Sequence, residues 1–332
     1  MKRLQDISRN SGESGAGCMK AMILCAGLGT RLRPITETIP KPLLPFFGKP
    51  VVVHTLDRFV EAGIEGFVIN LHHLPEKIMS ALGTAYRGVP IEYSREPEIL
   101  GPVGGIRKAL PLLGDEAFVV VNGDIVIDID YTGMLEQHKK TGAALTLAAG
   151  PGYERPELRA LGVDGRGRVR QVWGEPEWSG AALEKKVNLG AFVYEPRIAR
   201  DFIPDGAFYD FRTQMIPALF EAGERICVYE TGTYWNDIGT PESYLKAHMD
   251  IFNGKSAACS VKITDDLSVD SELSGRNYLE KNVVVEPGAS VGPCVAAYGG
   301  ATVGKGAAVK NSVILPGAVI RERTTVENTV VF

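Results

Sequence analysis

Short apolar runs alternate along the first half of the chain with longer segments in which apolar residues recur every three or four positions. The short runs have the length of buried strands, and the longer segments have the spacing of amphipathic helices. Buried strands are predicted at 21–26, 66–71, 117–121 and 143–149, and helices at 51–62, 76–82, 106–113 and 134–140. Strands that alternate with helices predict parallel βαβ units in a doubly wound α/β sheet.

Ligands of such sheets bind beyond the carboxyl ends of the strands. The residues from Gly27 onward and from Asn122 onward follow two of the predicted strands directly. These two segments are therefore the first places to look for chemistry.

The pattern changes to a β-rich one around residues 158–174. Two alternating runs flank Asp164-Gly165-Arg166-Gly167, which is a hairpin signal. A strand at 187–194, a helix at 211–222, a strand at 225–229 and a closing helix at 242–252 are predicted after it. We interpret this part as a β-rich insertion that packs against the sheet and can wall a second substrate pocket.

A third pattern begins near residue 282, where small aliphatic residues recur at every sixth position. The series is Val285, Val291, Ala297, Val303, Val309 and Leu315, after which the phase slips by one residue to Ile320 and Val326. Glycines mark the corners, so a β-helix solenoid is predicted. Such coils need neighbours, and this short array is expected to cap the first domain or to form oligomers.

These patterns divide the chain of 332 residues into four parts. Residues 1–18 are polar and small and are predicted to be a disordered extension. Residues 19–252 form the main domain, 253–281 a linker, and 282–332 the hexapeptide-repeat β-helix.

Composition and charge narrow the function. Lys and Arg number 36 against 40 Asp and Glu, and this lack of basic excess argues against nucleic-acid binding. No apolar stretch approaches the ~18 residues of a membrane span. The five cysteines, at 18, 25, 227, 259 and 294, show no metal-like spacing. We expect a reduced, cytoplasmic protein.

The most specific motif is GLGTRLRP at residues 27–34, directly after the first predicted strand, followed by Pro40-Lys41-Pro42. A P-loop requires Lys-Ser or Lys-Thr after its last glycine, and a dinucleotide-binding loop requires a third glycine where Leu32 stands. What remains is a tight turn whose backbone N–H groups can approach phosphates, with Arg31 and Lys41 adding positive charge. The structural alternative is a tight turn with basic residues on the surface.

Two further motifs carry carboxylates. Asn122-Gly123-Asp124 ends a predicted strand, where a carboxylate suits Mg²⁺, although an Asp there can also cap a turn. Trp235-Asn236-Asp237-Ile238-Gly239-Thr240-Pro241 is typical of a helix N-terminus. That interpretation accounts for Thr240 and Pro241 but leaves Asp237 without a role.

Together these motifs resemble those of the sugar-1-phosphate nucleotidyltransferases, also called nucleotide-sugar pyrophosphorylases. The resemblance covers about residues 19–252, and a hexapeptide-repeat tail is common in that family. Within the family, the chain is most similar to bacterial enzymes of the mannose-1-phosphate guanylyltransferase type. The resemblance implies an α/β fold with a Rossmann-like, doubly wound mixed sheet, a β-rich insertion and a short C-terminal left-handed β-helix.

The implied reaction joins an NTP and a sugar 1-phosphate into an NDP-sugar and pyrophosphate, in nucleotide-sugar and polysaccharide biosynthesis. By resemblance, Asp124 and Asp237 hold Mg²⁺ at the α-phosphate, while Arg31 and Lys41 clamp the phosphates. The residues implied to line the nucleotide are Leu24, Ala26, Gly27, Gly29, Thr30, Arg31, Lys41, Gly104 and Gly105. No general base is required, because a sugar phosphate is already anionic near pH 7.

The sugar side is implied to involve Asn122, Glu175, Asn188 and Gly190. The family often carries Glu-Lys-Pro where this chain has Gly174-Glu175-Pro176, so the lysine that holds the sugar's phosphate is missing. Lys185 or Lys186 could replace it, but two solvated lysines before a strand are the simpler interpretation.

On the base side, Pro102 replaces a usual threonine of the family, which leaves the base open. Overall similarity favours GTP with mannose 1-phosphate, or a related manno- or heptose 1-phosphate. A uridylyl- or thymidylyltransferase remains an alternative. So does a non-catalytic subunit that senses nucleotide sugars.

Overall fold

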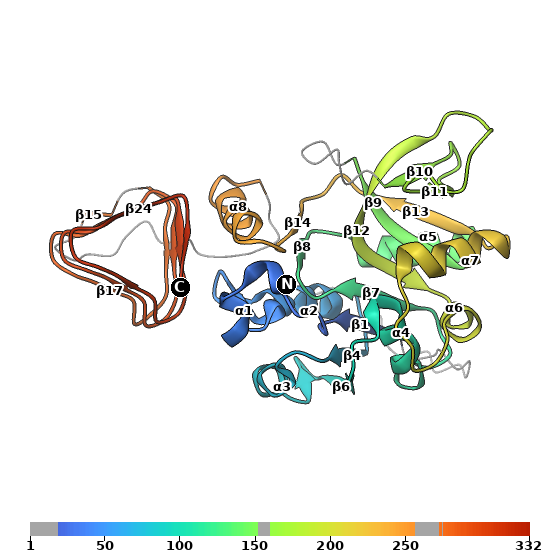
Figure 1. The fold of residues 1–332 in the computed structure, drawn as a ribbon, viewed down its shortest axis with the longest axis horizontal. Helices are drawn as coiled ribbons and strands as arrows, with labels where there is room; N and C mark the ends of the chain where they lie inside the picture. The colour runs from blue at the N-terminus through green and yellow to red at the C-terminus, as the bar shows by residue number, and fades with distance from the viewer. Residues whose placement is uncertain (1–18, 152–159, 256–271, 274) are drawn as a thin grey trace, which may run out of the picture.

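The computed structural model describes residues 19–151, 160–255, 272–273 and 275–332. It contains an α/β domain, residues 19–255, and a β-helix, residues 272–332, which stand side by side with helix α8 (Pro241–Phe252) between them (Figure 1). The predicted N-terminal extension and part of the predicted linker lie outside the described residues. In the part of the chain that is described, no helix has both the length and the apolar character to cross a membrane.

The α/β domain is built on a mixed sheet with the strand order β11-β10-β12-β7-β1-β4-β6-β5, to which β9 adds beside β12 and β13 beside β9. Its strands are β1 (Lys20–Leu24), β4 (Gly66–Leu71), β5 (Ala85–Tyr86), β6 (Val89–Arg95), β7 (Phe118–Asn122), β9 (Leu145–Gly150), β10 (Leu161–Val163), β11 (Val169–Val172), β12 (Glu184–Tyr194) and β13 (Ile226–Glu230). The central strands β7, β1, β4 and β6 are parallel, and β12 runs antiparallel to β7. The predicted doubly wound mixed sheet is confirmed.

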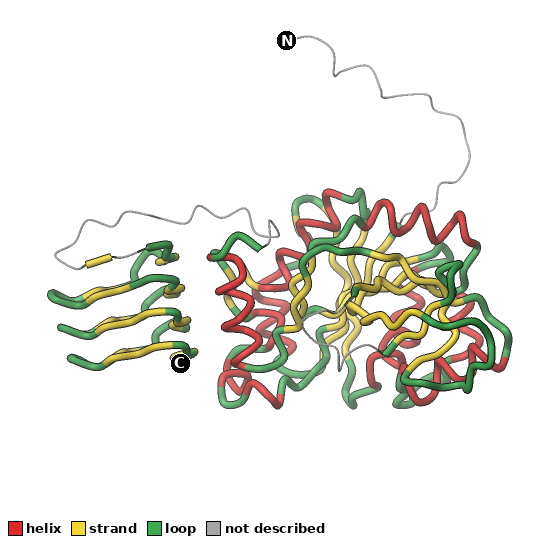
Figure 2. The backbone as a smooth tube through the Cα atoms, turned by 90° about the horizontal axis from the view of Figure 1, so that it is seen from above, coloured by secondary structure: helices red, strands yellow, loops and turns green. Residues whose placement is uncertain are grey.

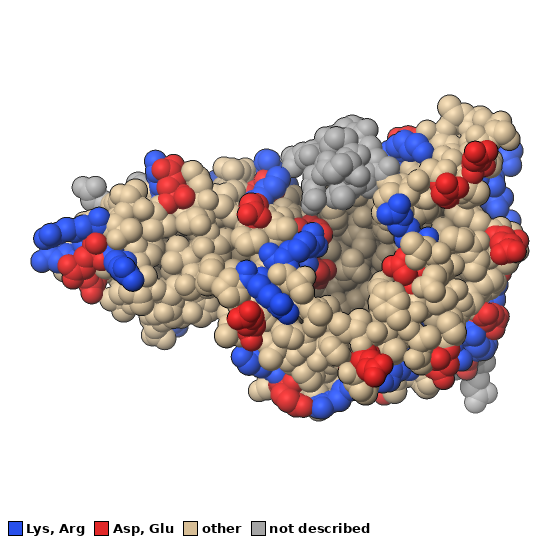
Figure 3. Space-filling model, in the orientation of Figure 1, with Lys and Arg blue, Asp and Glu red and all other residues tan. Residues whose placement is uncertain are grey.

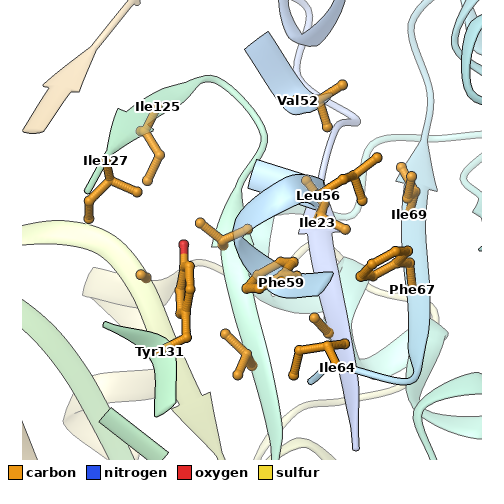
Figure 4. Close-up of a cluster of buried hydrophobic side chains, with 14 of the residues drawn as sticks. Ile23, Val52, Leu56, Phe59, Ile64, Phe67, Ile69, Ile125, Ile127 and Tyr131 are labelled. Atoms are coloured by element: carbon orange, nitrogen blue, oxygen red, sulfur yellow. The ribbon is translucent and has the colours of Figure 1, made fainter. Parts of the chain in front are cut away.

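Helices cover both faces of this sheet because successive strand side chains point to opposite sides. Ile23 packs on one face with Leu56, Phe59 and Phe67 (Figure 4), whereas Met22 packs on the other. The helices are α1 (Ile35–Thr38), α2 (Val51–Glu61), α3 (Pro75–Leu82), α4 (Gly101–Leu113), α5 (Tyr131–Thr141), α6 (Pro196–Phe202), α7 (Ile216–Glu221) and α8. Helix α4 begins at Gly101 rather than at the predicted Ile106.

The β-rich insertion is present as the antiparallel set β11-β10-β12. Asp164 closes the β10–β11 turn by accepting hydrogen bonds from the backbone N–H groups of Arg166 and Arg168, as the hairpin signal predicted. Residues 152–159, which begin the predicted hairpin segment, lie outside the described residues. The predicted helix at 211–222 is a wide turn at Phe211–Met215 followed by α7.

The β-helix stacks short parallel strands into three sheets that form a triangular prism (Figures 1 and 2). Its strands are β15 (Glu272–Leu273), β16 (Tyr278–Leu279), β17 (Val284–Val285), β18 (Ser290–Val291), β19 (Val295–Ala297), β20 (Thr302–Val303), β21 (Ala308–Lys310), β22 (Ser312–Ile314), β23 (Val319–Ile320), β24 (Thr325–Glu327) and β25 (Val330–Val331). The predicted boundary at 282 falls inside this array, because β15 and β16 already pair with later strands.

The hexad assignment of Leu315 is corrected by the structure. Ser290 pairs with Ala308, but Val295 pairs with Ser312, so the coil loses one residue at the corner before Ser312. The phase slip therefore precedes Leu315, and Ile314 is the side chain that fills the interior of the prism. Leu315 instead belongs to a cluster shared with the α/β domain.

That shared cluster joins the two parts of the molecule. Sheet β16-β19-β22-β25 faces α8, and its Tyr298, Val313 and Leu315 are buried together with Tyr244 and Phe252 of that helix. The β-helix thus caps the α/β domain through a packed apolar interface, as the repeat pattern predicted for one of its two possible roles.

Candidate active site

The glycine-rich turn after β1 has two kinds of glycine. Gly29 has φ of 63°, in the left-handed region, and a Cβ there would lie 2.9 Å from Cγ2 of Thr36. The hydroxyl of Thr36 donates a hydrogen bond to the Gly29 carbonyl at 2.8 Å and so fixes the turn. Gly27 is exposed, and nothing lies within 4 Å of its would-be Cβ, so its backbone is open to a ligand.

Asp124 follows β7 in a turn that only a glycine at 123 permits. A Cβ on Gly123 would lie 2.6 Å from Sγ of Cys25 and 2.9 Å from the Leu24 carbonyl oxygen. Burial, with a smaller contribution from Asp124, raises the pKa of the Cys25 thiol, so this group stays neutral and unreactive beside the carboxylate.

Asp237 reaches Asp124 through a strand pair that the sequence analysis did not predict. Strand β14 (Trp235–Asp237) pairs antiparallel with β8 (Ile125–Ile127), and this register sets Asp237 opposite Ile125. The N–H of Ile238 donates to the Asp124 carbonyl at 3.3 Å. Two carboxylates more than a hundred positions apart thereby meet at one end of the sheet.

Lys41 lies between the two carboxylates. Its Nζ donates a hydrogen bond to Oδ2 of Asp124 and is 3.5 Å from Oδ1 of Asp237. Arg31 places Nη2 at 4.0 Å from Oδ2 of Asp237. Lys41 is buried, whereas the Arg31 side chain is 65% exposed. The two cations therefore balance the two anions, and the exposed Arg31 is the one with freedom to turn toward a ligand.

A cavity of about 550 Å³ opens beside this cluster, with Arg31, Asp237 and Gly239 in its lining. Its lining also includes Gly150, Leu189 and the start of α8. Figure 3 shows this side of the molecule hollowed near its middle, with basic and acidic side chains gathered along one side of the hollow. A cavity of this size accommodates a small-molecule ligand.

The carboxylate pair fits a magnesium ion. Oδ1 of Asp237 is buried and accepts no hydrogen bond from the described residues. Mg²⁺ is commonly held by one or two carboxylates together with substrate phosphates. Among the described residues, no three or more His, Cys, Asp or Glu side chains gather as a metal site, so a cation here needs oxygens from a substrate or water as further ligands.

The residues proposed to bind the nucleotide lie in two separate parts of the structure. Leu24, Ala26, Gly27, Gly29 and Thr30 lie at or just after the end of β1, on the same stretch as Arg31. Gly104 and Gly105 lie inside α4 and are buried against the chain itself. Their would-be Cβ atoms meet the Ala207 carbonyl oxygen at 2.5 Å and Oε1 of Glu96 at 2.6 Å.

Three of the four proposed sugar residues lie together. Gly190 has φ of 77°, and a Cβ there would lie 2.7 Å from Nδ2 of Asn122. Its N–H donates to Oδ1 of Asn188 at 3.0 Å. Glu175 is exposed in the connection after β11, where its backbone pairs with that of Val172.

The two lysines near the start of β12 differ in their exposure. Lys185 is exposed, as predicted, but Lys186 is only 7% exposed and forms ion pairs with Glu184 and Glu230. Lys186 was therefore wrongly interpreted as solvated, because two glutamates compensate its burial. Trp173 is 44% exposed, with the Arg212 guanidinium 4.4 Å from its ring centroid.

Sequence reasoning missed Gly239, although it stands in the Trp-Asn-Asp motif. A Cβ at this position would lie 2.6 Å from Nη2 of Arg31 and 3.1 Å from Oδ1 of Asp237. Gly239 thus makes room for the arginine beside the carboxylate. It also missed the polar chain from the Cys25 N–H to Asn70 and Glu96, which fixes the ends of β1 and β4.

Comparison with known proteins places the geometry in context. A family model described as "Nucleotidyl transferase" matches residues 20–254. The chain is 31% identical over 309 residues to a mannose-1-phosphate guanylyltransferase of Mycobacterium tuberculosis, which covers 92% of this chain and 81% of that protein. It is 35% identical over 244 residues to a UTP–glucose-1-phosphate uridylyltransferase of Synechocystis, covering 69% and 62%.

Solved structures share the fold. A crystal structure of HddC from Yersinia pseudotuberculosis complexed with GMP-PN has a TM-score of 0.58 at 24% identity and covers 70% of this chain and 99% of its own. A putative glucose-1-phosphate thymidylyltransferase from Bacillus anthracis has a TM-score of 0.59 at 20% identity, covering 69% and 93%.

Proposed function

The chain belongs to the nucleotidyl transferase family and is a sugar-1-phosphate nucleotidyltransferase, and from that premise we propose that it transfers the guanylyl group of GTP to mannose 1-phosphate or to a related manno- or heptose 1-phosphate. The observation that carries the chemistry is the meeting of Arg31, Lys41, Asp124 and Asp237 beside one cavity. The proposed preference for guanine is supported by the Mycobacterium guanylyltransferase, whose similarity extends over 92% of the chain, whereas similarity to the Synechocystis uridylyltransferase covers 69%.

The proposed reaction is an in-line displacement at the α-phosphorus. An oxygen of the sugar phosphate forms the new P–O bond, and the bond from the α-phosphorus to its bridging oxygen breaks, so that pyrophosphate leaves with the electron pair. Lys41 and Arg31 lie where they can neutralise the phosphates as these anions approach. Mg²⁺, held by Asp124 and Asp237, would supply further charge neutralisation at the α-phosphate when bound.

The binding residues that we propose are those implied by the resemblance. The open backbone after β1, including Gly27 and Thr30, is proposed to line the nucleotide, with Gly104 and Gly105 shaping its base side. Asn122, Asn188 and Gly190 are proposed to hold the sugar, and Glu175 to join them from the insertion. The thiols of Cys25, Cys227 and Cys294 are free, which suits a reducing compartment. We therefore expect a cytoplasmic location.

The test is pyrophosphate release in the presence of Mg²⁺ across a panel of NTPs and sugar 1-phosphates. Fastest turnover with GTP and mannose 1-phosphate, and none when EDTA replaces Mg²⁺, is the expected result. Fastest turnover with UTP or dTTP would replace the base assignment by the uridylyl or thymidylyl alternative. Tight binding of an NDP-sugar without turnover of any pair would favour the non-catalytic sensor.

We also propose that the β-helix mediates a homo-oligomer through its sheet β17-β20-β23. Val284 and Val319 are 51% and 64% exposed, and both pair with Thr302, which lies between them in the sheet. The column formed by these three residues is therefore uncharged. Val319→Lys is expected to lower the mass measured by sedimentation equilibrium toward one chain. An unchanged mass for this variant would exclude that sheet as the contact.

A further inference from the structure

The segment that carries Lys41 continues into a short hairpin whose shape is unusual. Lys41 begins the turn Lys41–Leu43, which leads into β2 (Pro45–Phe46) and β3 (Lys49–Pro50). At the tip, Phe47 has φ of 46° and Gly48 has φ of 83°. A bulky residue rarely adopts the left-handed region, so the tip needs partners outside itself to hold this shape.

Those partners come from the β-helix. The hydroxyl of Tyr298, a residue with no exposed surface, accepts a hydrogen bond from the Phe47 N–H at 3.0 Å. Tyr278 closes over the next residue, since a Cβ on Gly48 would lie 2.9 Å from its hydroxyl oxygen. Ring contacts also link Phe47 to Tyr278 and to Phe252.

Helix α8 completes the network from its other side. Nδ1 of His248 lies 2.9 Å from the Tyr244 carbonyl oxygen, which can only accept, so Nδ1 carries the proton. Nε2 of His248 then accepts from the Tyr298 hydroxyl at 2.7 Å. Tyr298 therefore donates to α8 and accepts from the hairpin. Tyr244 adds a hydrogen bond from its own hydroxyl to the Pro45 carbonyl.

The consequence reaches the active site because the hairpin and Lys41 share one short, proline-stiffened stretch. Prolines at 40, 42, 45 and 50 leave few dihedral angles through which movement of the tip could be absorbed. Lys41 must hold its ammonium between two carboxylates, and a displacement of about 1 Å is enough to weaken catalysis substantially.

We propose that Tyr298 of the β-helix is a positioning residue for Lys41, so that the β-helix sets the geometry of the active site in addition to capping the domain. This proposal rests on the proposed role of Lys41 for its kinetic part only. Its structural part, that the Tyr298 hydroxyl orders residues 45–50, stands independently of the reaction.

The experiment compares Tyr298→Phe with Val313→Ala in the full chain. Tyr298→Phe removes only the hydroxyl, whereas Val313→Ala trims a buried side chain of the same interface where β22 packs near α8. We expect Tyr298→Phe to lower kcat about fivefold with KM for both substrates within about twofold, because Lys41 acts on charge that develops in the transition state. Val313→Ala should lower the melting temperature and leave kcat unchanged.

A second variant and a second measurement keep the two parts separate. Tyr244→Phe frees the same hairpin from α8 and should lower kcat in the same way. Amide exchange of residues 46–49 should accelerate in both tyrosine variants but not in Val313→Ala. Equal kcat and equal exchange in Tyr298→Phe and Val313→Ala would overturn the proposal. Faster exchange without any turnover in the wild-type chain would overturn the proposed function and leave the structural coupling in place.

Discussion

At the scale of single residues, the site depends on where side chains are absent as much as on where they are present. Gly123 allows the turn that presents Asp124, and Gly239 leaves the space that Arg31 occupies next to Asp237. Lys41 is the central charge, since it contacts both carboxylates. A small change at Gly239, which meets the end of the flexible Arg31 side chain, should therefore affect chemistry more than folding.

Removing either carboxylate should nearly abolish turnover. Asp124→Ala or Asp237→Ala is expected to reduce kcat by about 10²-fold or more, because charge neutralisation in the transition state is lost. Asp128→Asn is the matched control. Asp128 follows Asp124 on the same segment, but it lies outside the charged cluster and pairs with Arg58 at 2.8 Å. Pyrophosphate release measures the effect, and near-normal rates in both alanine variants would contradict the assignment of the pair.

Filling the space at Gly239 should displace Arg31. Gly239→Ala places a methyl group 2.6 Å from Nη2 of Arg31, and we expect about a tenfold loss of kcat/KM with little change in melting temperature. Gly232→Ala is the control, because Gly232 lines the same cavity with nothing within 4 Å of its would-be Cβ. Similar activity of the two variants would show that the position of Arg31 is unimportant.

The four charged residues of the candidate site were found in the sequence because their motifs resemble those of a known family, since the turns alone left structural alternatives open. The motifs at 27–34, 40–42, 122–124 and 235–241 led to Arg31, Lys41, Asp124 and Asp237, and the structure brings these four side chains together. Gly239 and Lys186 were not predicted correctly. Their roles depend on neighbours that are distant in the sequence, Arg31 in one case and Glu230 in the other.

At the scale of elements, α8 shows how a helix can serve two domains. Its capping box, formed by Thr240 and Ser243, starts the helix directly after Asp237. Its buried side includes His248, whose ring contacts Phe46 and Phe47 and bonds to Tyr298. Burial lowers the pKa of His248 to about 3, partly opposed by its hydrogen bond to the Tyr244 carbonyl.

This buried histidine should make stability depend on pH. The unfolded chain binds a proton at His248 below about pH 6.5 that the folded chain does not, so the stabilisation is fully present above that pH and is lost as the pH falls toward about 3. We expect the unfolding free energy of the wild type to fall more steeply than that of His248→Gln, by up to about 1.4 kcal/mol per pH unit. Urea unfolding between pH 4 and pH 7 measures the difference. Parallel curves would contradict the buried neutral ring.

The elements were predictable where one periodicity dominated. Strands β1, β4, β7 and β9 were predicted from buried apolar runs, and the coils of the β-helix from the six-residue period. Strand β6, which pairs with β4, was not predicted. The pairing of β14 with β8 was not foreseen, because both strands are short and their apolar residues show no clear period. Leu315 was wrongly predicted to fill the interior of the β-helix. An aliphatic residue at an interface between two parts of a chain produces the same sequence pattern as one in a core.

At the scale of the whole molecule, the shared apolar cluster predicts that the two parts unfold together. All three tryptophans, at 173, 178 and 235, lie in the α/β domain, so their fluorescence reports that domain alone. A cavity created by mutation inside the β-helix should still lower the unfolding temperature measured by tryptophan fluorescence if the interface couples the unfolding of the two parts.

Ile314→Ala is the variant for this test. Ile314 is fully buried inside the prism, and its truncation is expected to cost about 2–5 kcal/mol. We expect the tryptophan and far-ultraviolet transitions to move together to lower temperature. Phe332→Ala is the control, because this side chain is 62% exposed and should leave both transitions unchanged. A second transition that leaves the tryptophan signal in place would show that the two parts unfold independently.

The ammonium of Lys41 also bears on the order in which ligands arrive. Because it already compensates Asp124, a bare divalent cation would have to compete with it for the two acids. A triphosphate removes that competition, since its oxygens can accept hydrogen bonds from the ammonium while they also coordinate the cation. Cation and nucleotide should therefore enter as one complex, and calorimetric titration with magnesium chloride alone should give far weaker binding than titration with the magnesium–nucleotide salt.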